Sequence, residues 1–168
     1  MAVSRLKLRA HDVADLAVLS VALQDALVAV RDMAWLPKEH RFIILANRFC
    51  WEAEPEATPA EATADPGDEG DVSFAGASAT LFNRVNCGVC FDRVLSAKSR
   101  NLDRRQLDQL LNLLAIKSDG HILRLIFSGG AEVRLELARV AVHLEDLGEA
   151  WPTHWRPSHT LDDSGQAG

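Results

Sequence analysis

The chain has 168 residues, of which 48% are hydrophobic, and this is enough for one domain with its own core or for two small halves that share one. No window approaches the roughly 18 consecutive apolar residues of a transmembrane helix, and the N-terminus lacks the apolar core of a secretory signal. The formal net charge of −6 comes from residues 52–72, which hold eight acidic residues and no Lys or Arg, because the rest of the chain has 16 acidic and 18 basic residues.

The first 52 residues predict a strand, a helix and a hairpin. Residues 6–10 alternate apolar and basic side chains, as a short strand does. Asp12 is placed to cap a helix over residues 12–25, in which one apolar stripe recurs at helical spacing. Two apolar runs, 27–36 and 41–52, then flank a polar turn that begins at Pro37, and this pattern predicts a β-hairpin.

An acidic insertion is expected at residues 53–78. Glu, Pro, Ala, Thr, Asp and Gly dominate this segment, and it has too few large apolar side chains to offset the entropy cost of ordering. We therefore predict a disordered excursion from a single domain that spans residues 1–160. Residues 160–168 are polar and are predicted to form a frayed tail.

The second half of the chain predicts mostly strands. Residues 85–98 alternate as one long strand that bends near Gly88 or Arg93. A capping pattern from Asp103 to Gln106 predicts a short helix, and a second hairpin follows over 113–117 and 121–127. A further strand is expected from residue 131, and a short helical turn over 144–151.

The two halves are similar in order. Residues 5–52 and 92–137 each read as strand, helix, strand, strand, which suggests an internal pseudo-repeat. The predicted fold class is α+β, a mainly antiparallel β-sheet built from two β-α-β-β units. A curved or barrel-like sheet, as in pleckstrin-homology-like folds, is one form that it could take.

Four short motifs spread along the chain resemble those of a bacterial family catalogued only as a domain of unknown function. They are Asp32-Met33-Ala34-Trp35, Asn47-Arg48-Phe49-x-Trp51-Glu52, Phe91-Asp92-x-Val94-Leu95 and Leu144-x-Asp146-Leu147-Gly148. The resemblance covers nearly all of the chain outside the acidic insertion. It implies no activity, cofactor or catalytic residue.

Cys87-Gly88-Val89-Cys90 has the spacing of a redox pair or of half a zinc site. Residues three apart on a strand point to opposite faces, however, and no second C-x-x-C or zinc-type histidine spacing completes a metal site. We therefore expect no metal and no cofactor. No catalytic residue is predicted, because the chain has no nucleophile-elbow, phosphate-loop or dinucleotide-binding motif.

The densest basic cluster is a candidate site for anions such as phosphate groups. It consists of Arg93, Lys98, Arg100, Arg104 and Arg105. Interleaved acidic residues favour the alternative of a solvated, salt-bridged surface. A further hypothesis is that the acidic insertion folds over this patch and shields it.

Trp35 and Trp51 lie on or beside the first predicted hairpin and are candidate partner-binding residues, with core packing as the alternative. The leading functional prediction is a non-enzymatic binding or interaction module in the cytoplasm, since three cysteines without a dense framework indicate a reducing compartment. A protein partner or self-association is expected, with no membrane and with nucleic acid disfavoured. The alternative is a small enzyme whose site is assembled from residues distant in sequence.

Overall fold

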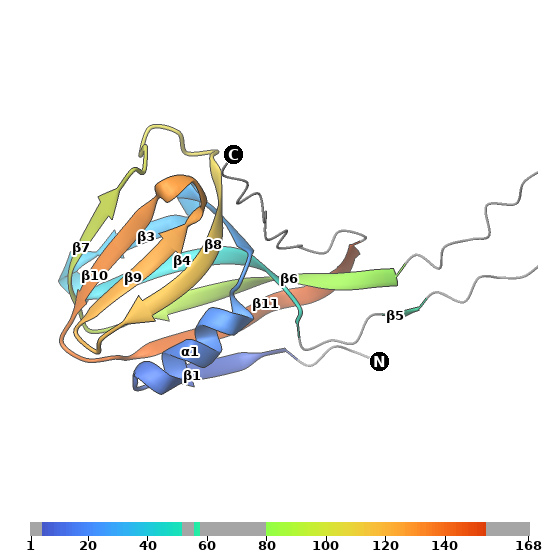
Figure 1. Cartoon of the computed structure of the whole chain (residues 1–168), viewed down its shortest axis with the longest axis horizontal. Coiled ribbons are helices and arrows are strands. Elements are labelled where there is room, and N and C mark those ends of the chain that lie inside the picture. The colour runs from blue at the N-terminus through green and yellow to red at the C-terminus, as the bar shows by residue number, and fades with distance from the viewer. Residues whose placement is uncertain (1–4, 52–55, 58–79, 154–168) are drawn as a thin grey trace, which may run out of the picture.

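The computed structural model describes residues 5–51, 56–57 and 80–153, which form one helix and a large antiparallel sheet (Figure 1). The elements are β1 (Lys7–Ala10), α1 (Val13–Ala22), β2 (Ala26–Ala29), β3 (Met33–Leu36), β4 (Arg41–Phe49), β5 (Glu56–Ala57), β6 (Thr80–Phe91), β7 (Val94–Arg100), β8 (Leu110–Ser118), β9 (Ile122–Phe127), β10 (Glu132–Leu137) and β11 (Val142–Thr153). Short 3₁₀ turns lie at Val30–Asp32, Pro37–Glu39 and Ser128–Gly130. The predicted α+β class with a mainly antiparallel sheet is confirmed.

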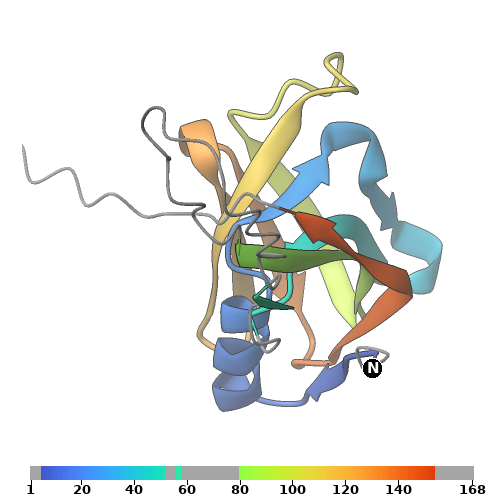
Figure 2. The same cartoon turned by 90° about the vertical axis from the view of Figure 1, so that its right-hand side faces the viewer.

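The strands follow the order β1-β11-β6-β4-β2-β8-β9-β10-β7, and β3 and β5 pair with β4 and β6. The sheet curves strongly, so that β7–β10 face β3, β4 and β6 across the core (Figures 1 and 2). The Val94 N–H donates to the His40 carbonyl (2.9 Å), which ties the start of β7 to the turn between β3 and β4. The described strands nevertheless do not close into a barrel, because their order ends at β1 and β7.

Helix α1 begins where the sequence predicts. The Asp12 carboxylate accepts a hydrogen bond from the Asp15 N–H (2.8 Å), which satisfies one of the free donors at the N-terminus. Leu16 and Leu19 are buried against the sheet, while the Ser20 hydroxyl accepts from the Ile116 N–H of β8 (3.0 Å). The helix thus covers one end of the curved sheet.

The first predicted hairpin is correct at β3 and β4, which pair from Met33↔Ile44 to Leu36↔Arg41. The run 27–36 is not one strand, however. A 3₁₀ turn at Val30–Asp32 divides it, because β2 forms most of its pairs with β8, whereas β3 pairs with β4. The second hairpin is confirmed as β8 and β9.

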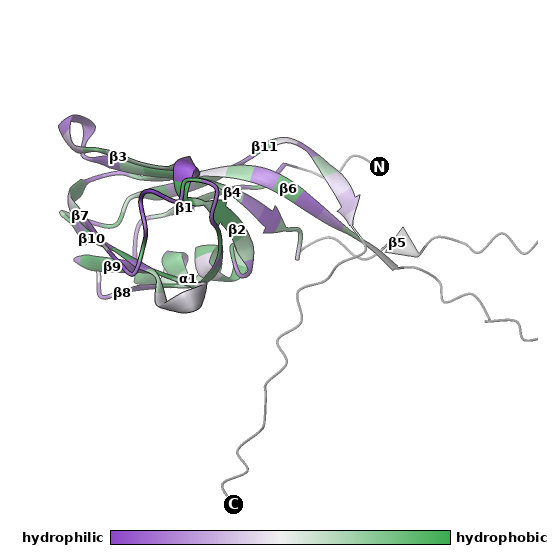
Figure 3. Cartoon of the chain, turned by 90° about the horizontal axis from the view of Figure 1, so that it is seen from above, coloured by the Kyte–Doolittle hydropathy of each residue, from purple (hydrophilic) through white to green (hydrophobic). Residues whose placement is uncertain are grey.

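The long strand predicted over 85–98 is divided at Asp92 and Arg93 into β6 and β7. Arg93 has φ +58°, a left-handed conformation that turns the chain sharply, so the bend falls at the second of the two predicted positions. Hydrophobic and hydrophilic residues alternate along β6 (Figure 3). The inward residues of its second half, Val85, Cys87, Val89 and Phe91, are all buried.

The helix predicted from Asp103 is absent, and that prediction is wrong. The Asp103 carboxylate caps a turn by accepting from the Arg105 N–H (2.9 Å). Leu110 and Leu111 then pair with Ala29 and Val28 of β2, and these backbone bonds outweigh the local helix signal. The second β-α-β-β unit therefore lacks its helix, and the helical turn predicted over 144–151 is also wrong, because those residues belong to β11.

The predicted acidic insertion and the predicted C-terminal tail consist largely of residues that the structure does not describe. Of the predicted insertion 53–78, the structure describes Glu56–Ala57, which form β5 and pair with Leu81 and Thr80 of β6. The remainder of that insertion and the predicted tail 160–168 lie outside the described residues. Within the described part, no helix is long and apolar enough to cross a membrane.

The core contains a buried ion pair between β4 and β11. Arg48 is fully buried, and its Nε and one terminal nitrogen each lie 2.7 Å from a different oxygen of Asp146. Asp146 also accepts a hydrogen bond from the Leu6 N–H (2.8 Å). This pair connects the N-terminal segment with strands β4 and β11.

Candidate functional site

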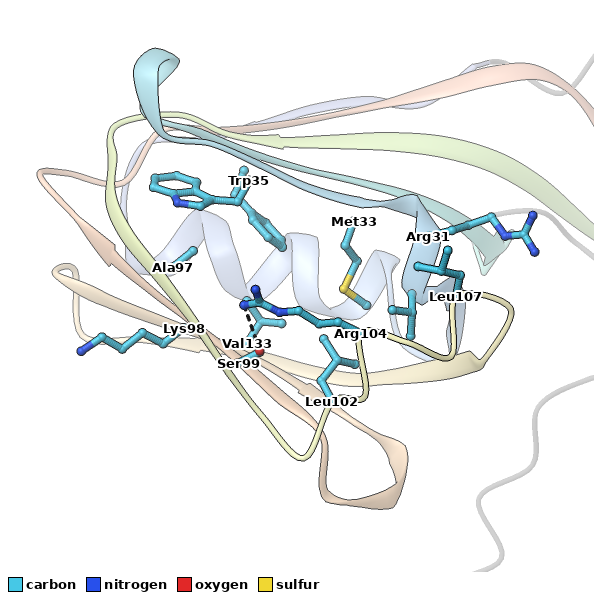
Figure 4. A pocket seen from close by; sticks show the side chains of 12 residues that line it. Arg31, Met33, Trp35, Ala97, Lys98, Ser99, Leu102, Arg104, Leu107 and Val133 are labelled. Carbon is cyan, nitrogen blue, oxygen red and sulfur yellow. Dashed lines mark hydrogen bonds between the residues drawn. The ribbon is translucent and has the colours of Figure 1, made fainter.

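A pocket of about 310 Å³ opens where the curved sheet fails to close, between β3 and β7 (Figure 4). Strands β3 and β4 form one wall, β7 and β10 form the other, and the loop 101–109 borders the opening. The volume lies at the lower end of the range found for small-molecule sites.

The pocket walls are largely apolar. Met33 and Trp35 alternate with exposed Ala34 on β3, so strand periodicity directs both side chains toward the pocket. Phe42 lies opposite Trp35 in the β3–β4 register, and Val133 comes from β10. Met33 and Trp35 remain half-buried, so the pocket exposes apolar surface that a ligand could cover.

Three basic residues border this apolar surface. Arg31 forms an ion pair with Asp108, and its side chain points away from the pocket (Figure 4). Lys98 also points outward, whereas the guanidinium group of Arg104 lies over the pocket. One Arg104 terminal nitrogen is 3.5 Å from the Ser99 hydroxyl oxygen. Among the described residues, Arg104 has no ion pair with a carboxylate, and no carboxylate lines this pocket.

The structure separates the basic residues that the sequence grouped together. Lys98 and Arg104 border the pocket, and Arg105 is exposed on the same loop without lining it. Arg100 instead pairs with Glu132 (3.2 Å). Arg93 lines a different hollow.

Trp35 and Trp51, the two candidate partner-binding residues, lie in different parts of the structure. Trp35 lines the pocket, whereas the Trp51 indole N–H donates to the Gln24 carbonyl (3.2 Å) and its ring packs on Phe49 with centroids 4.5 Å apart. Sequence analysis missed the apolar wall formed by Met33, Phe42 and Val133. The alternation of side chains along β3 could have placed Met33 on the same face as Trp35. The position of Val133 could not be predicted in this way, because it depends on where β10 lies in the sheet order.

A second hollow of about 520 Å³ surrounds Arg93, between the turn at Pro37–Glu39 and the turn that precedes β11. Its lining mixes charges of both signs. Arg41 donates to Asp92 (Nε to Oδ1, 2.8 Å) and approaches Glu39 (3.5 Å). Asp92 and Glu39 already compensate the positive charge of Arg41. We therefore regard the more apolar pocket beneath Arg104 as the better ligand site.

The two cysteines of the C-x-x-C motif point to opposite faces, as strand geometry predicts. Cys87 is fully buried, and its burial raises the pKa of the thiol to about 12. Cys90 is half-buried on the other face, and burial, together with the negative charge of Asp92, raises its pKa to about 11. The two cysteines therefore do not form a redox pair with each other.

Cys90 is expected to be a slow nucleophile. Its pKa rises from 9.0 to about 11, so its thiolate fraction near neutral pH should be roughly 100-fold lower than that of an ordinary thiol. Alkylation by iodoacetamide in the presence of a chelator, mapped by mass spectrometry, should be slowed by a similar factor. The rate should keep increasing above about pH 9, and a rate that equals that of an unstructured cysteine peptide would contradict the raised pKa.

Comparisons with known proteins give a family but no activity. A family model described as "Protein of unknown function (DUF2948)" matches residues 6–159. No curated protein and no solved structure matches the chain.

Proposed function

Because the chain belongs to the DUF2948 family, whose description assigns no activity, we propose a function from the pocket geometry. The protein is a non-enzymatic binding module that takes up a small, largely apolar anion in the pocket between β3 and β7. A medium-chain or aromatic carboxylate has the required chemistry. The main support is the position of Arg104, whose guanidinium group lies over a largely apolar pocket that no carboxylate of a described residue lines.

The apolar walls supply most of the expected affinity. Each methylene group that a ligand buries against Met33, Trp35 and Phe42 contributes about 0.8 kcal/mol through the hydrophobic effect. Aromatic walls also suit a ring, which can pack against Trp35 in an offset or edge-to-face arrangement. The pocket therefore favours an apolar body over a sugar or a nucleotide.

Arg104 supplies the selectivity for an anion. A guanidinium group presents a planar pair of N–H donors that matches the two oxygens of a carboxylate. The Ser99 hydroxyl beside it can donate a further hydrogen bond.

The composition of the pocket supports binding over catalysis. Its ionisable residues are Arg31, Lys98 and Arg104, all of which are basic. Ser99 and Lys98 line the pocket, but a serine or lysine nucleophile is usually activated by a neighbouring group such as a carboxylate or an imidazole. The described lining of the pocket offers neither a carboxylate nor an imidazole.

The test is binding of decanoate to the full chain, measured by displacement of the apolar aromatic anion 8-anilinonaphthalene-1-sulfonate. Arg104→Gln should weaken decanoate binding by about tenfold or more, because it removes a charge-assisted hydrogen bond at the carboxylate. Arg105→Gln is the matched control, since it removes the same charge from the same loop outside the pocket. Decanol should bind both variants and the parent protein equally.

Equal weakening by the two substitutions would mean that general electrostatic attraction, and not the pocket, holds the anion. Failure of Trp35→Ala to reduce probe binding would also contradict the assignment, because Trp35 forms part of the pocket wall. A protein partner that binds over Trp35 is the competing proposal. It predicts saturable binding of a polypeptide and no competition by decanoate.

Three finer predictions remain proposals alongside this function. The reduced thiols of Cys87 and Cys90 support action in the cytoplasm. The strongly curved antiparallel sheet supports the comparison with pleckstrin-homology-like folds. The paired hairpins β3–β4 and β8–β9 support an internal repeat, although the second half lacks the predicted helix.

A further inference from the structure

Three metal-binding residue types meet on the outer face of the sheet, away from the proposed pocket. Cys90 of β6 and His143 of β11 lie directly opposite each other in the antiparallel register. Asp92 follows β6 by one residue, and its N–H donates to the Ala141 carbonyl (2.8 Å), which fixes it beside the start of β11. Cys90 and Asp92 are two residues apart, so the extended chain presents them on the same face.

The separations of the donor atoms suit one small ion. Cys90 Sγ is 3.7 Å from Asp92 Oδ1, and His143 Nδ1 is 3.6 Å from Asp92 Oδ2. All three ligand atoms lie within 4.8 Å of one another. Ligands around a tetrahedral zinc ion are separated by roughly 3.4–3.6 Å, so small side-chain adjustments would complete the geometry.

Arg41 positions the carboxylate. Its Nε donates to Asp92 Oδ1 (2.8 Å), which leaves Oδ2 directed toward His143. A hydrogen bond from outside the ligand set is a common way to orient a metal-binding carboxylate. The positive charge of Arg41 is compensated, because Glu39 lies 3.5 Å from its other side.

We propose that Cys90, Asp92 and His143 form a binding site for one divalent transition-metal ion, with zinc as the best match. Thiolate, imidazole and carboxylate ligands together favour zinc over magnesium or calcium, which prefer oxygen ligands. Binding releases the thiol proton of Cys90 to solvent, since the thiolate is the ligand. Asp92, Glu39 and the Cys90 thiolate then balance the charges of the ion and Arg41.

Three protein ligands leave the fourth position of a tetrahedral ion for a solvent molecule or an exogenous ligand. The position is accessible, because the side chains of His143 and Asp92 are 49% and 29% exposed. The hollow that contains Asp92 also contains Arg93 and Arg139, so an anion is the chemical class that best fits as an exogenous fourth ligand.

Cobalt(II) is the probe for this proposal, because a cobalt–thiolate bond gives a charge-transfer band in the near ultraviolet. The full chain, stripped with a chelator and kept in a thiol-free reducing buffer, should show this band with saturation at one equivalent. Added Zn²⁺ should displace the cobalt and abolish the band. Cys90→Ser should remove the charge-transfer intensity, and His143→Ala should weaken cobalt binding by at least about tenfold.

Cys87→Ala and His121→Ala are the matched controls. Cys87 lies on the same strand but on the buried face, and His121 is an exposed histidine at the β8–β9 turn. Both should keep the band. A band that Cys87→Ala removes or Cys90→Ser retains, or no band in the parent protein, would overturn the site. His143→Ala changes an exposed side chain and should not disturb the fold. If circular dichroism shows that a cysteine variant is unfolded, the loss of cobalt affinity in His143→Ala still tests the site.

Discussion

Replacing Arg48 with methionine is expected to lower the free energy of unfolding by about 3–5 kcal/mol, because it leaves the carboxylate of Asp146 buried without its guanidinium partner. Asp146 is 4% exposed, so water cannot take over both lost hydrogen bonds. The Leu6 N–H would still donate to Asp146, but one neutral donor does not compensate a buried charge. Urea unfolding monitored by circular dichroism measures the change.

The control for this prediction is the exposed ion pair between Lys7 and Glu145, whose side chains are 69% and 51% exposed. Lys7→Met should cost less than about 1 kcal/mol, because solvent screens such pairs. The double variant Arg48→Met with Asp146→Leu should recover much of the loss, since it removes both buried charges. A loss below about 1 kcal/mol in Arg48→Met alone would show that the pair adds little to stability.

Phe42→Ala is the second substitution with a large expected effect, about 3–5 kcal/mol of lost stability. Phe42 is 5% exposed, and its ring centroid lies 6.2 Å from that of Phe91 on the neighbouring strand. Truncation would remove this contact and join the pocket to a new cavity in the core. Thermal and urea unfolding of the variant both measure the loss.

Leu95→Ala is the matched truncation, because Leu95 is 53% exposed and belongs to the nearby strand β7. Its expected cost is less than about 1 kcal/mol, in keeping with surface substitutions. If both truncations cost the same, Phe42 would not be a packed member of the core. Phe42→Leu, which retains most of the apolar volume, should lie between the two values.

Sequence analysis correctly predicted elements whose signals are local. Asp12 caps α1 through a neighbour three residues away, and Pro37 begins the turn that joins β3 to β4. The signal at Asp103 was equally local but misleading. There, pairing of Leu110 and Leu111 with β2 determines the structure, and this partner lies far away in the sequence.

The candidate sites depended on such distant pairings even more strongly. Trp35 and Arg104 were both singled out from sequence, but their meeting at one pocket requires β3 and β7 to lie at the open seam of the sheet. Cys90 was singled out as part of a C-x-x-C motif, whereas the residue that faces it is His143. Neither sequence spacing nor hydrophobic periodicity reveals this register.

The position of β7 has a consequence for self-assembly. Among the described strands, β7 ends the sheet order and pairs with β10 alone, so its other edge could act as a template for a strand of a second molecule. The sheet curves this edge toward β3, and Lys98 and Arg100 place charges along it. Curvature and charge together disfavour fibril-like growth, so the seam that we propose as a ligand site also discourages strand addition from another copy.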